Sequence, residues 1–286
     1  MKKKWKTDVG FHVPKLMLLE IWPLTPFIGQ SEGLNVIDVG CNVGVWCQAF
    51  MNTYGEQVKK YHGIDPLEGN LKVFKERISD DLLPSSENIV LHHGCMGPSN
   101  GEVEIHYNNE VSTLASVVLD SMQVGSRTVR NDKKRVVKQS ALTSFCKEHD
   151  MSNVDLLKID VEGYEWDVLM GAKELLNSKR LDMVLFEFGQ HQGALGQSFK
   201  QFWDLLSGHD FHIYRQAVGR NFFGMQHLER YDRSLEKFDS MWMILASRKK
   251  HDEKLNSPLV IGRYPYPKVV RARRGLTGLM ERTFRK

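Results

Sequence analysis

The chain has 286 residues, 41% of them hydrophobic and 26% charged, with a formal net charge of +4 and four cysteines that form no Cys-x-x-Cys pair. This composition is typical of a globular protein that buries its core without disulfides or structural metal, and it excludes a mainly disordered chain, a zinc ribbon and a disulfide scaffold. Because no apolar secretory stretch follows the lysines at positions 2–4, and no apolar run approaches the roughly 18 residues of a membrane span, we expect a cytoplasmic protein.

Strand and helix patterns alternate along residues 35–250 and predict one doubly wound α/β domain. The first unit is an apolar strand over 35–39, a glycine turn over 40–44 and a helix over 45–54. The other strands expected in the sheet lie at 61–65, 89–93, 154–159, 183–188, 211–214 and 241–246. The other expected helices lie at 68–78, 142–149, 164–176 and 198–206. This order predicts a mostly parallel sheet of seven strands that ends in an antiparallel edge.

Four segments depart from this alternation. Residues 101–107 alternate like an added hairpin strand, and residues 112–138 form a polar and basic insertion. Residues 1–34 are predicted to be a flanking segment or lid, and residues 251–286 a basic tail. The insertion and the tail have three interpretations: a clamp for an acidic acceptor, a weak contact with a membrane surface or with nucleic acid, or a solvated face.

The glycine turn after the first strand has the features of a nucleoside-binding turn. In doubly wound sheets the ligand lies beyond the carboxyl ends of the strands, where a glycine turn lets the backbone approach it. The stretch 38–44, Asp-Val-Gly-Cys-Asn-Val-Gly, lacks the motifs of phosphate and dinucleotide loops, and its Asp-x-Gly-x-x-x-Gly pattern suits S-adenosylmethionine. Asp65 ends the second strand, where its carboxylate is placed to accept hydrogen bonds from a ribose diol or, alternatively, to cap the next helix. The predicted cofactor residues are Asp38, Gly40, Asn42, Gly44, Asp65, Gly94, Cys95 and Asp160.

Charged side chains interrupt two of the apolar strands. Strand alternation places Lys158, Asp160 and Glu162 on one face, and Glu187 repeats the anomaly on the next strand. Burying such charges is costly unless they pair or face an open site, so we expect these four candidate catalytic residues to meet in one crevice. The alternative is that the acids at 160 and 162 cap the following helix while the lysine neutralises them. His191 is a further candidate base, and because these acids and His191 have no recognised metal spacing, no metal is predicted.

Three stretches of the chain, 36–44, 156–165 and 185–189, resemble the FkbM-type methyltransferase family. The second stretch, Leu-Leu-Lys-Ile-Asp-Val-Glu-Gly-Tyr-Glu, is the most specific of them. The resemblance covers roughly residues 36–248. It implies a Rossmann-like class I methyltransferase fold, S-adenosylmethionine as the donor, and a hydroxyl acceptor on a sugar or secondary metabolite. The family commonly has Glu where this chain has Asp65, a change that keeps the carboxylate.

The sequence therefore predicts an S-adenosylmethionine-dependent O-methyltransferase that acts on a small-molecule or glycan hydroxyl. Methyl transfer to a hydroxyl needs a base, and Asp160 or Glu162 is placed to accept the proton while Lys158 holds the acceptor oxygen. No stable nucleic-acid partner is expected for such an enzyme. Two other functions stay open: an RNA methyltransferase that uses the basic tail, and a non-catalytic scaffold that binds the cofactor.

Overall fold

The computed structural model describes residues 20–79, 85–118, 121–124, 127–218, 223–236, 238 and 242–251. Residues 1–19 of the predicted flank and the predicted basic tail after residue 251 lie outside the described residues. Within the described part, no helix is long and apolar enough to cross a membrane. The four cysteines are buried and free.

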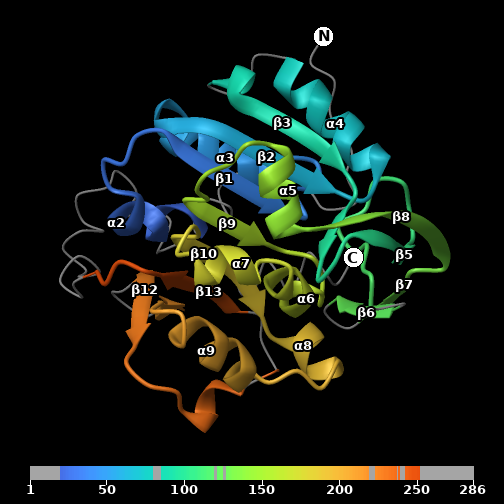
Figure 1. Cartoon of the computed structure of the whole chain (residues 1–286). Helices are drawn as coiled ribbons and strands as arrows, with labels where there is room; N and C mark the ends of the chain where they lie inside the picture. Colours follow the sequence, from blue (N-terminus) through green and yellow to red (C-terminus); the bar gives the residue numbers. More distant parts are fainter. Residues whose placement is uncertain are drawn as a thin grey trace.

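An eight-stranded sheet is the centre of the described fold (Figure 1). Its strands are β1 (Leu34–Val39), β2 (Val58–Asp65), β3 (Ile89–His93), β9 (Leu156–Ile159), β10 (Met183–Phe188), β11 (His212–Val218), β12 (Phe223–Leu228) and β13 (Trp242–Ser247). They lie in the order β12-β11-β13-β10-β9-β1-β2-β3. The five strands from β3 to β10 are parallel, and β13, β11 and β12 each run antiparallel to the preceding strand in the sheet. The predicted α/β class is confirmed, but the predicted count of seven strands is wrong because β12 adds a third antiparallel strand at the edge.

Helices cover both faces of the sheet. On one face lie the short helix η1 (Trp22–Leu24), α2 (Thr25–Ile28), α3 (Val45–Tyr54) and α4 (Glu68–Ser79). On the other face lie α5 (Leu142–Glu148), α6 (Glu165–Met170), α7 (Lys173–Asn177) and α9 (Phe199–Ser207). The helix α8 (Gln190–Ala194) follows β10, and the single turns η2 (Gly55–Gln57), η3 (Ser86–Asn88) and η4 (Arg233–Leu235) connect other elements.

Alternate residues of the central strands enter two separate cores. Val36 and Leu156 pack on the α3 side of the sheet, whereas Ile37 and Leu157 pack on the α6 side. Four apolar residues of the N-terminal flank also belong to the α3-side core: Ile21, Leu24, Phe27 and Ile28. Because both faces are covered, a charged residue on a central strand has to find a partner inside the protein.

The predicted helix over 164–176 is two helices, α6 and α7. They are separated at Gly171, where a Cβ atom would lie 2.1 Å from the carbonyl oxygen of Gly97. The Gly171 carbonyl accepts hydrogen bonds from the amide and the hydroxyl of Thr143, both at 3.0 Å, instead of continuing the helical ladder. The apolar stripe predicted along this segment is nevertheless buried.

A small sheet lies beside the carboxyl ends of β2 and β3 (Figure 1). It consists of β4 (Cys95–Gly97), β8 (Lys133–Ala141) and β5 (Gly101–Tyr107), and a separate hairpin joins β6 (Ser121–Val124) to β7 (Arg127–Arg130). The predicted strand at 101–107 is thereby confirmed, paired antiparallel with β8. The loop before the hairpin packs on α4 so closely that a Cβ on Gly69 would lie 2.1 Å from the carbonyl oxygen of Glu110. This contact brings Ser112 to the end of the main sheet.

Candidate functional site

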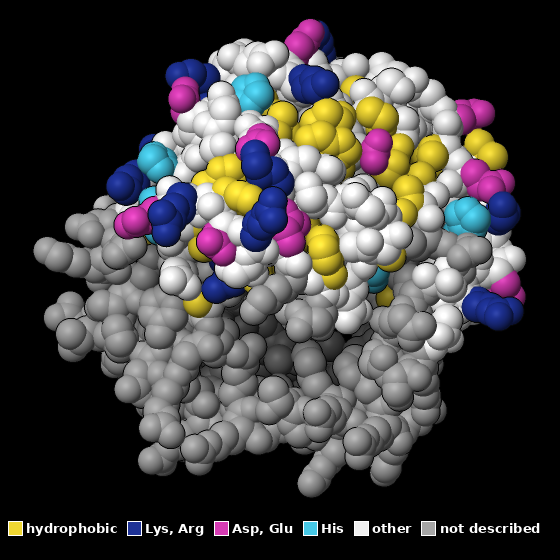
Figure 2. All heavy atoms as spheres, turned by 90° about the horizontal axis from the view of Figure 1, so that it is seen from below, with side chains coloured by type: hydrophobic (Ala, Val, Ile, Leu, Met, Phe, Trp, Pro, Cys, Tyr) yellow, Lys and Arg dark blue, Asp and Glu magenta, His cyan; other side chains and the backbone are white. Residues whose placement is uncertain are grey.

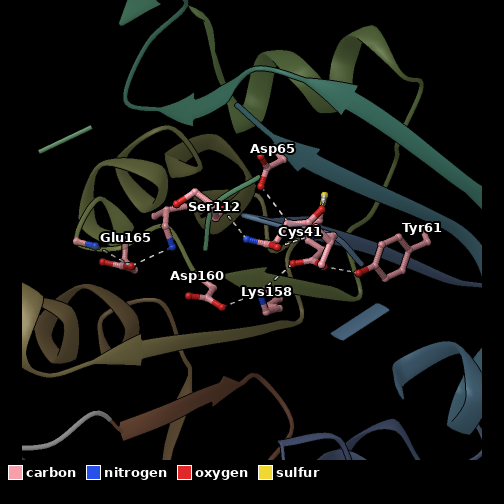
Figure 3. Close-up of polar contacts among 12 residues, drawn as sticks. Cys41, Tyr61, Asp65, Ser112, Lys158, Asp160 and Glu165 are labelled. Carbon is pink, nitrogen blue, oxygen red and sulfur yellow. Dashed lines mark hydrogen bonds and ion pairs between the residues drawn. The ribbon is translucent and has the colours of Figure 1, made fainter. Parts of the chain in front are cut away.

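A buried ion-pair network joins β1 to β9 at the carboxyl end of the sheet. The parallel register places Asp38 opposite Lys158, and the Lys158 ammonium lies 3.1 Å from Asp38 Oδ1 and 3.2 Å from Asp160 Oδ2. The Tyr61 hydroxyl donates a hydrogen bond to Asp38 Oδ2, and Lys158 Nζ lies 5.6 Å from the centre of the Trp46 ring. Figure 3 shows Lys158 and Asp160 side by side, with Tyr61 approaching from β2. The lysine therefore neutralises acids on two adjacent strands.

Lys158 has little freedom to bind an acceptor molecule. Its side chain is 3% exposed, and that of Asp38 is fully buried. Burial lowers the pKa of the Lys158 ammonium, but Asp160 and Asp38 stabilise its positive charge and raise the pKa above the usual value. Because two carboxylates already share its charge, the position of Lys158 does not support the predicted role in holding the acceptor oxygen. The Asp160 side chain is the most open of the three, with 38% of its surface exposed.

The glycine turn after β1 packs directly against the end of β9. Gly40 has a φ of +80°, and a Cβ atom there would lie 1.8 Å from the carbonyl oxygen of Asp160. Only glycine tolerates both the conformation and this contact. The amides of Gly40 and Cys41 donate to the carbonyl of Ile64 at 2.9 and 3.0 Å. The turn is thus fixed between β2 and β9, with Asp160 beside it.

Asp65 is the centre of a second hydrogen-bonded group. Its Oδ2 accepts from Asn42 N at 3.0 Å, and its Oδ1 accepts from Leu67 N at 2.9 Å and from Asn70 Nδ2 at 3.0 Å. Asn42 and Asn70 both also donate to the Ser112 carbonyl at 2.9 Å. Burial raises the pKa of Asp65 to about 6. The hydrogen bond from Leu67 N is the helix cap of the alternative interpretation. Because a carboxylate has about four acceptor positions and three are occupied, one is left for a ribose hydroxyl. That contact stays a prediction.

Three other predicted cofactor residues have structural contacts at this end of the sheet. A Cβ on Gly44 would lie 2.4 Å from the Phe74 ring, and the residue has a φ of +79°. The Gly94 amide donates to the Asp65 carbonyl at 3.1 Å. Cys95 begins β4, and burial raises the pKa of its thiol to about 12, so the sulfur is not a nucleophile at neutral pH. Their contacts with a cofactor stay predictions.

Beyond the end of β9 the chain makes a strained turn. Glu162 has a φ of 56°, a conformation that costs a side-chain-bearing residue about 1–3 kcal/mol. The buried Glu165 carboxylate holds the turn, since its Oε1 accepts from Val161 N and Gly163 N, both at 3.2 Å. The Ser116 hydroxyl donates to the Glu162 carbonyl at 2.8 Å. β9 ends at Ile159, so the strand alternation predicted through Glu162 does not extend to this residue, which lies in the turn.

Several carboxylates lie close enough to Glu187 to act on its charge. Burial raises the pKa of Glu187 well above the usual value, and repulsion from Asp160, Glu162, Glu20 and Glu165 raises it further. Burial and the charge of Asp160 also raise the pKa of Glu20 to about 7. These acids therefore lie near one another beyond the ends of β9 and β10, with Glu20 of the N-terminal segment among them. That they line one crevice stays a prediction.

His191 pairs with Glu162 across the turn. Its Nδ1 lies 3.0 Å from Glu162 Oε2, and the two side chains are 13% and 17% exposed. Burial lowers the pKa of His191, but the hydrogen bond to Glu162 and the charge of that carboxylate outweigh burial and raise it. Among the described residues, no three potential metal ligands are grouped so as to hold an ion.

Five residues of the site were not singled out as site residues from the sequence: Glu20, Tyr61, Asn70, Glu165 and Gln192. Three of them have a local signal. Asn70 lies in the first turn of α4, after the predicted capping residue, and Glu165 lies in the first turn of α6. Gln192 has one too, since its Oε1 accepts from Gly189 N at 2.7 Å, as in a helix-capping interaction. Tyr61 and Glu20 reach the site through the packing of distant segments, for which the sequence has no local pattern.

The chain matches the model of the FkbM methyltransferase domain over residues 38–213. No curated protein sequence matches it. Among solved structures it is similar to the methyltransferase FkbM from Methylobacillus flagellatus KT, with 13% identity and a TM-score of 0.47 over 80% of this chain and 47% of that chain. It is also similar to precorrin-6y C5,15-methyltransferase from Geobacter metallireducens GS-15 (8% identity, TM-score 0.43, 87% of this chain and 95% of that chain). A third similar structure is TrmK from M. capricolum in complex with S-adenosyl-homocysteine (11% identity, TM-score 0.41, 85% of this chain and 70% of that chain).

The chain spans about half the length of the first of these structures. All three are loose likenesses of overall shape, with TM-scores below 0.5. The match to the family model, which extends over well more than half of the chain, is the stronger finding.

Proposed function

The chain belongs to the FkbM methyltransferase family, and we propose that it transfers the methyl group of S-adenosylmethionine to a hydroxyl on an uncharged sugar, glycan or secondary metabolite. The single observation that carries this proposal is the acidic carboxyl edge of the sheet, where the charge of Lys158 is already balanced by two carboxylates. The reaction is a displacement at the sulfonium methyl, so the protein has to align two molecules and accept one proton.

The acids at this edge fit the charge of the proposed donor. When bound, S-adenosylmethionine supplies an electrophilic methyl group, and it carries positive charge on both its sulfonium and its ammonium. Asp160 is the exposed acid beside the Gly40 turn and would hold the cationic end of the donor. Asp65, at the end of β2, would hold the ribose through its remaining acceptor position.

The same acids favour an uncharged acceptor. Glu187 and Glu20 have raised pKa values because they are buried and lie near other carboxylates. A phosphate brought to this edge of the sheet would add negative charge to a group of acids that already repel one another, whereas a neutral hydroxyl would not. The acid-lined edge therefore supports a neutral glycoside or metabolite more than a phosphorylated one.

The described basic residues give little support to an RNA acceptor. Lys134 and Arg135, in the predicted basic insertion, are each paired with an acid at 2.7 Å, Glu104 and Glu110 respectively. On the face seen in Figure 2, lysine and arginine side chains lie beside aspartates and glutamates instead of gathering into a patch of one sign. Nucleic-acid binding depends on such a patch, so we propose no stable nucleic-acid partner.

The test is a methyl-transfer assay with S-adenosylmethionine labelled in its methyl group. The panel contains neutral methyl glycosides, the corresponding sugar phosphates and total RNA. We expect label in neutral hydroxyl compounds, little in the phosphates, and none in RNA. Label in RNA alone would replace this proposal with the RNA methyltransferase. Donor binding without transfer to any class would favour the non-catalytic scaffold, whose function should survive Asp160→Asn and Glu162→Gln.

A further inference from the structure

The His191 ring is held by one nitrogen and open at the other. Nδ1 lies 3.0 Å from Glu162 Oε2, and neither side chain is more than one-fifth exposed. No described residue makes a hydrogen bond to Nε2, so the contacts that hold the ring leave this nitrogen without a protein partner, and 13% of the side chain is exposed. A carboxylate on Nδ1 fixes the tautomer whose Nε2 accepts a proton, as in the histidine of a hydrolase triad.

A single network positions both members of the pair. His191 and Gln192 are neighbours on α8, and Gln192 Nε2 donates to Glu165 Oε2 at 2.6 Å. The other oxygen of Glu165 accepts the two amides on either side of Glu162. The carboxylate of Glu165 therefore ties the turn that carries the acid to the helix that carries the imidazole.

Glu162 is held in an unfavourable conformation by these contacts. Its φ of 56° is maintained by the hydrogen bonds that the neighbouring backbone amides donate to Glu165, and by the hydrogen bond that the Ser116 hydroxyl donates to its carbonyl. The next residue, Gly163, has a φ of +106°, and a Cβ there would lie 2.9 Å from Leu195 Cδ1 and 3.5 Å from His191 Cβ. Strain that the surroundings maintain from several sides is typical of functional sites. Here its effect is to aim the Glu162 carboxylate at His191.

The charged groups with the largest effect on His191 in the described part of the chain are acids. Glu162 and Glu165 act on it across the turn, and Asp160 acts from the end of β9. Glu187 on β10 interacts in turn with Glu162. Glu162, Glu165 and Asp160 each stabilise an imidazolium, so they assist the ring in taking up a proton once an acceptor is bound.

We propose that His191 is the general base of the methyl transfer and that Glu162 is its positioning residue, an inference that rests on the proposed function. His191 Nε2 takes the proton of the acceptor hydroxyl as the hydroxyl oxygen forms its bond to the methyl carbon. The carbon–sulfur bond breaks, and its electron pair stays on the sulfur, which becomes a neutral thioether. The imidazolium that results is stabilised by the Glu162 carboxylate and later returns its proton to water. Glu162, which the sequence proposed as a base in its own right, thereby acts through the imidazole.

The test compares His191→Gln, Glu162→Gln and the control His212→Asn, a histidine on the distant strand β11. Calorimetry with S-adenosylmethionine comes first, and we expect all three variants to bind the donor within about twofold of the native protein. In the labelled-donor assay with neutral glycosides, His191→Gln should lower kcat by about 10²–10⁴-fold. Its profile of kcat/KM against pH should lose the acid limb that reports deprotonation of the base. His212→Asn should keep both the rate and the profile.

The variant Glu162→Gln tests whether Glu162 acts on the His191 imidazole or only stabilises the turn. The amide oxygen can still accept the Nδ1 hydrogen, so the ring stays in place, but the charge that stabilises the imidazolium is gone. We expect the acid limb to move down by about 1 pH unit and the plateau to fall. In nitrogen-15 spectra of the full-length protein labelled at histidine, the pKa of His191 should fall by the same amount in this variant, and native His191 should carry its proton on Nδ1 at high pH.

Three outcomes would overturn the inference. If His191→Gln transfers methyl groups with an unchanged pH profile, the base lies elsewhere while the proposed function stands. If the pKa of His191 measured by nitrogen-15 titration is the same in Glu162→Gln as in the native protein, His191 and Glu162 do not pair in solution. If the native protein fails to bind S-adenosylmethionine, the proposed function and the inference fall together.

Discussion

The carboxylates on the β2 side of the paired strands β1 and β9 have different surroundings from those on the β10 side. On the β2 side, Asp65 accepts three N–H groups and Asp38 is paired with Lys158 and Tyr61, so each acid is matched to donors within the fold. On the β10 side, Glu187 and Glu162 lie near other acids, and Glu162 occupies a strained backbone conformation.

We interpret this difference as a division between acids that stabilise the fold and acids that take part in the reaction. Acids with satisfied partners stabilise the turns that shape a binding surface, and removing their partners exposes a buried charge. Acids that are buried near other acids hold a proton more readily, since both burial and repulsion raise their pKa values. We therefore expect substitutions on the first side to change stability and substitutions on the second side to change turnover.

The largest effect on stability should come from Lys158→Met. This change leaves Asp38 buried without a cation, which should lower the free energy of unfolding by about 3–5 kcal/mol. Urea denaturation of the native and variant proteins measures the loss. Lys200→Met is the matched control, because Lys200 forms an exposed ion pair with Asp204 within one helix and should cost no more than about 0.5 kcal/mol.

The double variant Lys158→Met with Asp38→Asn sharpens this result. The neutral amide can still accept the Tyr61 hydroxyl, so the double variant should recover part of the stability lost in the single one. If Lys158→Met is no more destabilising than Lys200→Met, the ion pair between Lys158 and Asp38 does not stabilise the fold.

A smaller effect should distinguish Asp65→Asn from Glu162→Gln. In Asp65→Asn the new amide group faces the Asn42 amide, so a buried N–H loses its acceptor at a cost of about 1–3 kcal/mol. In Glu162→Gln the amide oxygen still accepts from His191, and stability should change by no more than about 0.5 kcal/mol. Urea midpoints of the two variants at neutral pH give the comparison. Equal losses of stability in the two variants would show that the Glu162 carboxylate stabilises the fold as much as the Asp65 carboxylate does.

Much of the fold follows from local patterns in the sequence. The helix α3 and the strands β3, β5 and β10 lie at the predicted bounds, because each has a clear apolar or alternating run closed by turn residues. The strand β12 was missed, since Gly224, Gln226 and His227 interrupt its apolar pattern and its place depends on pairing with β11. The break between α6 and α7 depends on the contact of Gly171 with Gly97, far away in the chain.

The sequence predicted the site correctly where the residues follow the side-chain alternation of a β-strand. Lys158 and Asp160 share a face, as alternation predicts, and their side chains are in contact. The alternation does not extend to Glu162, whose conformation depends on a hydroxyl 46 residues away in the sequence. The partner of that acid, His191, was only a secondary candidate, because no local pattern shows which loop histidine will face the turn.

The most direct test of the account is calorimetric titration of S-adenosylmethionine into the native protein, Asp160→Asn and Glu104→Gln. Asp160 lies beside the Gly40 turn, where the cationic end of the donor is proposed to bind, whereas Glu104 is an exposed acid on β5. We expect the native protein to bind the donor and Asp160→Asn to weaken binding by about tenfold, equivalent to about 1.4 kcal/mol. Glu104→Gln should leave the affinity unchanged. No binding by the native protein, or equal affinity in Asp160→Asn, would contradict the proposed donor site.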